Sequence, residues 1–266
     1  MEKLISDKIN GDIIKVKLGN NVIGGDKLAF ISGPCAVESY ENMRKIAGSL
    51  SSQGINILRA GAYKPRTSPY DFQGMGIEGL KILKETADEF KMSVVSEVMD
   101  ARDIEGALPY VDMIQVGSRN MYNYTFLKEL GKLKVPVLLK RGMSATLMEW
   151  LYAAEYILKE GNDQVVLCER GIRTFETSTR NSLDLNSVAL IKKDYRLPVI
   201  VDPSHGTGRR ELVSVMSRAA VAAGADGLII ESHISPDNSI SDARQTIDSE
   251  DLHDIMNVCQ KIREII

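Results

Sequence analysis

The chain has 266 residues and a formal net charge of −3, with 44% hydrophobic and 26% charged residues. This composition is ordinary for a soluble globular protein, and the charge does not favour a nucleic acid or an anionic membrane as partner. The N-terminus lacks the apolar stretch of a signal peptide, and no window has the roughly 18 apolar residues of a membrane span. Three widely spaced cysteines do not suit a disulfide framework. We therefore expect a reduced, cytoplasmic protein that binds neither nucleic acid nor membranes.

The first predicted element is a β-hairpin over residues 12–25. Ile14, Val16 and Leu18 alternate with polar residues, and Asn20-Asn21 provides a turn before a second short apolar segment. The hairpin precedes every other predicted strand. We therefore expect residues 1–26 to form an N-terminal extension of the main fold.

Eight short apolar runs follow, each separated from the next by a longer segment with helical spacing. The runs are Leu28–Ser32, Ile55–Arg59, Ser93–Val98, Met113–Val116, Val135–Leu139, Val165–Cys168, Val199–Val201 and Gly227–Ile230. They are continuously hydrophobic rather than alternating, which is typical of parallel strands buried on both faces. Eight strands alternating with helices predict a (β/α)8 TIM barrel over residues 27–266, with the hairpin closing its bottom.

Two of the intervening segments show clear helical patterns. We expect Ser144 to cap a helix that stops at Gly161. A second helix is predicted over residues 207–224. Its inward face is predicted to carry Leu212, Val215, Met216 and Ala219.

Basic residues collect just after the predicted strands, where the active site of such a barrel lies. They are Arg59, Lys64, Arg66, Arg119, Lys140 and Arg170. Single strand-end Arg and Lys residues often only solvate the rim, but six together favour an anionic ligand. Two phosphates and a carboxylate would balance them better than one phosphate, and the guanidinium fork suits both groups.

A second group of residues could bind a metal. Cys35 follows the first strand, His205 follows the seventh, and Glu231 and Asp242 follow the eighth. In a closed barrel the first strand lies next to the eighth, which lies next to the seventh, so these residues should meet. A sulfur, nitrogen and oxygen donor set suits a divalent transition ion such as Mn, Fe, Zn or Co. Taken singly, Cys35 could equally be a small core residue and His205 an ordinary loop histidine.

Five motifs are distributed over most of the chain. They are GPCAVES at 33–39, RAGAYKPRTSPYDFQG at 59–74, LLKRG at 138–142, CERGIRTFE at 168–176 and DPSHGTG at 202–208. With them, the chain resembles the 3-deoxy-D-arabino-heptulosonate 7-phosphate (DAHP) synthases, in the compact form related to 3-deoxy-D-manno-octulosonate 8-phosphate (KDO8P) synthases. The resemblance implies condensation of phosphoenolpyruvate with erythrose 4-phosphate and water, the first step of the shikimate pathway and of aromatic amino acid biosynthesis. It also implies a homotetramer.

The resemblance further implies roles for individual residues. Cys35, His205, Glu231 and Asp242 would be the metal ligands. Lys64, with Cys35 and His205, would be catalytic, and either Lys64 or a metal-bound water would protonate the developing alkoxide. The phosphoenolpyruvate site would comprise Arg59, Lys64, Arg119, Lys140 and Arg170, with Glu97 and the Ser118 backbone beside the phosphate. The loop that grips the aldose phosphate would comprise Pro65, Arg66, Thr67 and Ser68.

Three alternatives remain open from the sequence. The nearest is KDO8P synthase activity, which uses arabinose 5-phosphate. A Schiff-base aldolase with Lys140 as nucleophile is a different mechanistic class. A barrel that only binds phosphate is the non-enzymatic alternative.

Overall fold

The computed structural model describes residues 3–66 and 68–266, and within them eight parallel strands close into a barrel. Around the barrel the strand order is β10-β3-β4-β5-β6-β7-β8-β9. The strands are β3 (Ala29–Gly33), β4 (Ile57–Arg59), β5 (Ser93–Glu97), β6 (Met113–Val116), β7 (Val137–Lys140), β8 (Val165–Glu169), β9 (Val199–Val201) and β10 (Gly227–Glu231). This confirms the predicted (β/α)8 barrel, and each predicted run matches its strand to within two residues at either end.

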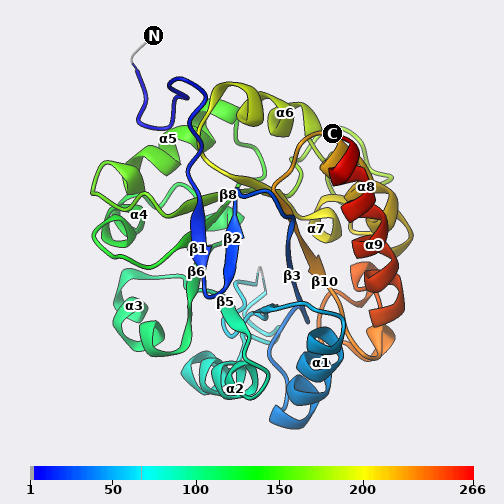
Figure 1. The fold of residues 1–266 in the computed structure, drawn as a ribbon. Coiled ribbons are helices and arrows are strands. Elements are labelled where there is room, and N and C mark those ends of the chain that lie inside the picture. Colours follow the sequence, from blue (N-terminus) through cyan, green and yellow to red (C-terminus); the bar gives the residue numbers. More distant parts are fainter. Residues whose placement is uncertain (1–2, 67) are drawn as a thin grey trace.

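Helices surround the barrel on its outside (Figure 1). They are α1 (Tyr40–Ser52), α2 (Gly76–Glu89), α3 (Ala101–Ala107), α4 (Tyr124–Gly131), α5 (Leu147–Leu158), α6 (Leu185–Asp194), α7 (Pro203–Thr207), α8 (Arg210–Ala222) and α9 (Ser249–Ile265). Short 3-10 turns are η1 (Leu108–Tyr110), η2 (Ser118–Asn120), η3 (Pro236–Asn238) and η4 (Ala243–Gln245). In the described part of the chain, no helix combines the length and apolar character needed to cross a membrane.

The predicted N-terminal hairpin is present as β1 (Val16–Leu18) and β2 (Asn21–Ile23), and it lies across the barrel (Figure 1). Leu18 pairs with Asn21, so the turn is Gly19-Asn20 and not the predicted Asn20-Asn21. Gly19 has φ +57°, and a Cβ there would lie 2.6 Å from Oγ of Ser93, the first residue of β5. The hairpin therefore closes the N-terminal end of the barrel, as expected. The division into residues 1–26 and 27–266 stays a prediction.

The structure corrects the predicted start of α5. Its N-cap is Thr146, not Ser144. The Thr146 Oγ1 accepts the Glu149 backbone N–H at 3.2 Å, and the Glu149 carboxylate accepts the Thr146 backbone N–H at 2.8 Å. This reciprocal pair satisfies two backbone donors that the first helical turn leaves free.

The predicted single helix over 207–224 is also wrong in detail. Gly208 adopts the left-handed conformation (φ +68°), ends α7, and separates it from α8. The buried residues of α8 are Val213, Ser217, Ala220 and Val221, whereas the predicted inward residue Val215 is 45% exposed. The inner face of α8 is therefore displaced by one residue from the predicted one.

The capping geometry predicts different effects for two neighbouring hydroxyl residues. Thr146→Ala should lower the free energy of unfolding by about 1 kcal/mol because it removes the acceptor for the Glu149 N–H. Ser144→Ala, at an exposed position, should change it by less than about 0.5 kcal/mol. Urea denaturation of both variants measures the difference, and equal effects would contradict the capping assignment.

Candidate active site

A cavity of about 210 Å³ opens at the C-terminal ends of the barrel strands. All six predicted basic residues line it, together with the predicted residues Pro65, Glu97, Ser118, His205 and Asp242. The described residues that line it are Arg59, Lys64, Pro65, Arg66, Asp71, Glu97, Gln115, Gly117, Ser118, Arg119, Lys140, Met143, Arg170, Arg180, His205 and Asp242. Seven of these side chains are Lys or Arg and only three are carboxylates, so the cavity is strongly cationic.

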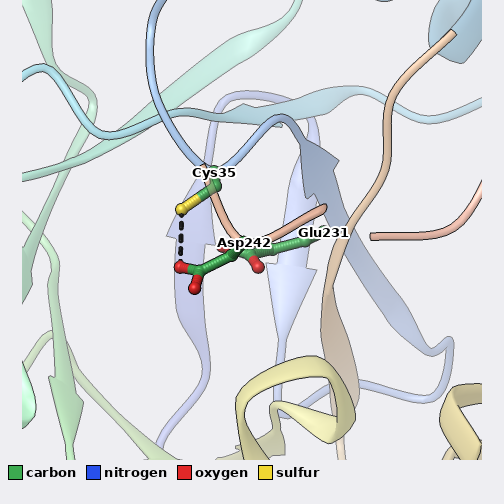
Figure 2. A group of neighbouring side chains, drawn as sticks. All are labelled: Cys35, Glu231 and Asp242. Atoms are coloured by element: carbon green, nitrogen blue, oxygen red, sulfur yellow. Dashed lines mark hydrogen bonds between the residues drawn. The ribbon is translucent and has the colours of Figure 1, made fainter. Parts of the chain in front are cut away.

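Three of the four predicted metal ligands lie together beside this cavity. One ligand atom each from Cys35, Glu231 and Asp242 lies within 4.8 Å of the other two, and Figure 2 shows these side chains converging. The Cys35 thiol donates to Asp242 Oδ2 at 3.0 Å. Glu231 is the last residue of β10 and pairs with Gly33 of β3, two residues before Cys35. Closure of the barrel between its first and last strands therefore creates the group.

His205, the fourth predicted ligand, lies next to this group without being one of the three. Its Nε2 is 3.6 Å from Glu231 Oε1, and its Nδ1 is 2.8 Å from Asp202 Oδ2. Asp202 also caps α7 by accepting the His205 backbone N–H at 2.9 Å. Burial lowers the pKa of His205, although Asp202 and Glu231 oppose this effect. A neutral imidazole whose Nδ1 faces a carboxylate leaves Nε2 available as a metal ligand.

The ionisation of the cluster fits a divalent transition metal. Burial, followed by the nearby Glu231, raises the pKa of the Cys35 thiol to about 12. Burial alone would also raise the pKa of Glu231, but His205 and Arg59 outweigh it and lower that pKa. A thiol beside two ionised carboxylates loses its proton readily only when a cation is added. The sulfur, imidazole and carboxylate donors match the preferences of Mn, Fe, Co or Zn better than those of Mg or Ca.

The cations of the cavity fall into two classes. Arg59 forms an ion pair with Glu231 at 3.0 Å, and Lys140 forms one with Asp202 at 2.6 Å. In contrast, among the described residues no carboxylate lies within 4.0 Å of the side-chain nitrogens of Arg119 or of the buried Arg170. Within the described part of the chain Arg170 donates only to the Gly171 carbonyl, and burial lowers the pKa of its guanidinium. A buried cation without a counter-charge is costly, so Arg170 favours an anionic ligand.

Glu97 is the predicted carboxyl group beside the phosphate. It ends β5 and accepts a hydrogen bond from Gln115 Nε2 at 3.1 Å. A Cβ on Gly117 would lie 2.1 Å from Glu97 Oε1, so any larger residue at position 117 would displace the carboxyl group. Desolvation raises the pKa of Glu97, although Lys140 and Lys64 oppose it. A protonated Glu97 could donate a hydrogen bond to a phosphate oxygen in the cavity.

Two of the three described residues of the predicted aldose-phosphate loop reach the cavity. Pro65 and Arg66 line the cavity, and Arg66 Nη2 donates to Ser241 Oγ, next to Asp242. Ser68 is not a lining residue; its hydroxyl accepts the Tyr70 N–H at 3.2 Å. Thr67 lies outside the described residues.

Five lining residues were not predicted from the sequence: Asp71, Gln115, Gly117, Met143 and Arg180. Arg180 is the most consequential, because its Nη1 lies 3.3 Å from Asp242 Oδ1 and donates to Gln245 Oε1 at 2.9 Å. Its position ten residues after Arg170 gave no sign of this, since it depends on how the loop between them folds back to pair Ile172 with Ser182. Gln115 could have been found as a polar residue inside an otherwise apolar strand.

The chain is similar to known enzymes of two related kinds. A phospho-2-dehydro-3-deoxyheptonate aldolase of Thermotoga maritima is 45% identical over 264 residues, which cover 99% of this chain and 78% of the relative. A 2-dehydro-3-deoxyphosphooctonate aldolase of Koribacter versatilis is 31% identical over 92% of this chain and 94% of its own length.

Two solved structures are also similar to this chain. The crystal structure of the Thermotoga maritima aldolase superposes with a TM-score of 0.95 at 44% identity, covering 98% of this chain and 77% of the other. A truncated form of the 3-deoxy-D-arabino-heptulosonate 7-phosphate synthase from the same organism gives 0.91 at 42% identity, covering 98% and 96%. The family model of the DAHP synthetase I family matches residues 12–266, and the chain belongs to this family.

Proposed function

We propose that the protein condenses phosphoenolpyruvate with erythrose 4-phosphate and water to give DAHP and phosphate, the first step of the shikimate pathway. The observation that carries this proposal is the cationic cavity directly beside a thiol, an imidazole and two carboxylates. The names of the Thermotoga maritima relatives support it. In this reaction the vinyl carbon of phosphoenolpyruvate bonds to the aldehyde carbon, water adds at the former C2, and phosphate leaves by C–O cleavage.

Phosphoenolpyruvate would occupy the part of the cavity lined by Lys140, Arg170 and Arg119. Arg170 is buried and has no carboxylate partner among the described residues, so a phosphate or carboxylate group would supply its missing counter-charge. Arg59 and Lys64 would complete the site from β4 and the loop after it. Glu97 and the Ser118 backbone would lie beside the phosphate. The collected cations bring together two reactants of like charge, which diffusion alone disfavours.

Cys35, His205, Glu231 and Asp242 would hold a divalent metal ion. Such an ion would act as a Lewis acid toward the aldehyde oxygen. Lys64 Nζ donates to both the Cys35 carbonyl and its sulfur at 2.9 Å while its side chain lines the cavity. It can therefore deliver a proton to the oxygen that develops negative charge on the aldehyde carbon.

Three alternatives have less support. The imine mechanism requires a neutral Lys140 amine, but Lys140 is held at 2.6 Å from the Asp202 carboxylate. KDO8P synthase activity is supported by relatives of lower identity, such as the 31% identical Koribacter versatilis protein. A barrel that only binds phosphate would not need the Cys35 group. The homotetramer and the cytoplasmic location stay predictions.

The choice of aldose is tested directly with the purified protein. Turnover of phosphoenolpyruvate should be fastest with erythrose 4-phosphate and at least about tenfold slower with arabinose 5-phosphate. Release of inorganic phosphate measures both rates. Equal or faster turnover of the pentose would overturn the assignment in favour of the KDO8P reaction.

Removal of metal tests the ligand set. EDTA should abolish activity, and Mn²⁺ or a similar ion should restore it. Cys35→Ser should lose at least about 100-fold in activity and bind less metal by elemental analysis. Cys259→Ser, in a buried position of α9, is the matched control and should keep both. Full activity in thoroughly metal-stripped protein would exclude the proposed role of the metal.

Arg66→Ala tests the aldose-phosphate loop. The KM for erythrose 4-phosphate should rise by about 10- to 100-fold, because a charged hydrogen bond to phosphate contributes roughly 1.5–3 kcal/mol. The KM for phosphoenolpyruvate should change much less. Arg102→Ala, which removes an exposed arginine paired with Asp100, controls for the loss of charge. An equal rise in both KM values would contradict the assignment.

A further inference from the structure

Two neighbouring strands each end in a pair of charged residues that point in opposite directions. In β7 and the residue after it, Lys140 lines the cavity while Arg141 does not. In β8 and the residue after it, Arg170 lines the cavity while Glu169 does not. This alternation follows from the period of two along a strand. Arg141 and Glu169 therefore lie on the outer side of the barrel, directly behind two cations of the cavity.

Arg141 is the centre of a buried polar network. It is 3% exposed, and its Nη1 donates to Glu169 Oε2 and Asp184 Oδ2 at 2.8 Å each and to Ser187 Oγ at 3.0 Å. Its Nε donates to the Ala145 carbonyl at 3.1 Å, and its guanidinium lies 5.7 Å from the centroid of the Trp150 ring. One side chain thus connects β7 with β8, with the loop before α5, and with the start of α6.

Glu169 extends this network to the backbone that carries Arg170. The side chain is fully buried, and Oε1 accepts the Gly171 N–H at 2.6 Å while Oε2 accepts from Arg141. The carbonyl of Glu169 also accepts the Asp202 N–H at 2.8 Å. Glu169 therefore fixes the backbone on both sides of Arg170. It also contacts the residue that follows the neighbouring strand β9, Asp202, which is the partner of Lys140.

We propose that the Arg141–Glu169 pair is a positioning device that fixes Lys140 and Arg170 in the geometry that phosphoenolpyruvate requires. Both members are chain neighbours of the cations that they position, and neither lines the cavity. A rigid supporting shell of this kind matters because a displacement of about 1 Å in a site can cost about 100-fold in rate. This inference rests on the proposed function of the cavity.

Glu169→Gln is the variant that tests the proposal. The amide keeps the size of the carboxyl group but offers Arg141 a neutral partner, so the guanidinium is expected to shift toward Asp184. The Kd of phosphoenolpyruvate by calorimetry, and its KM, should each rise at least about tenfold, while the KM for erythrose 4-phosphate stays within about threefold. Arg141→Lys, which keeps the charge but lacks the planar fork, should raise the same two constants.

Asp226→Asn is the matched control. Asp226 is also buried, accepts one backbone N–H from Val199 at 2.8 Å and one cation, Lys192, at 2.6 Å, but it precedes β10 at the opposite end of the barrel. It should lower the thermal midpoint as Glu169→Gln does and leave the Kd of phosphoenolpyruvate unchanged.

The outcomes separate the positioning role from a purely structural one. If Glu169→Gln and Asp226→Asn lower stability alike and both leave the Kd and KM of phosphoenolpyruvate within about twofold, the pair only stabilises the fold and the proposal is wrong. Wild-type protein that binds phosphoenolpyruvate but makes no DAHP would instead overturn the proposed function, and the Kd values of the variants would still decide on the positioning role.

Discussion

The pairing of β10 with β3 is the contact on which the candidate site depends. It places Glu231 opposite Gly33, so that Cys35 and Asp242, about 200 residues apart in sequence, come within 3.0 Å. On its other side β3 packs closely against β4, and this requires a glycine at position 33. A Cβ there would lie 2.1 Å from the Arg59 carbonyl oxygen, and the residue has φ +147°. Because Arg59 in turn pairs with Glu231, the same closure positions a cation of the cavity and a candidate metal ligand together.

The charges around this closure are arranged so that some are neutralised inside the protein and others are not. Lys140, Asp202 and His205 form a connected chain of contacts at 2.6 and 2.8 Å. Burial alone would raise the pKa of Asp202, but His205 and Lys140 hold it well below its usual value. Arg170 has no such partner in the described parts of the chain, and its pKa is lowered by burial. The unbalanced positive charge is therefore concentrated where an anionic substrate would lie.

A second layer of charge lies outside the barrel and supports the first. Arg141 forms ion pairs with Glu169 and Asp184 between the strands and the helices α5 and α6, whereas the cavity cations face inward. Breaking a buried pair by removing one partner typically costs roughly 3–5 kcal/mol. Such a layer resists small displacements of the strand ends, and the cavity depends on those ends for its shape.

The amino-acid sequence by itself determined the barrel, the order of its strands and most of the cationic residues. Continuous apolar runs such as Val199–Val201 can be buried only between neighbouring layers, and the barrel rule then places the residues after them at one rim. The sequence alone could not determine how the loops fold at that rim. Arg180 reaches Asp242 because of the path of a long loop, and Ser68 turns away from the cavity although it follows Arg66 by two residues. The first turns of α5 and α8 could not be predicted either, because Thr146 and Gly208 act through local backbone geometry. Only the tertiary structure decided which cations of the cavity have a carboxylate partner, because pairing depends on distances between residues far apart in sequence.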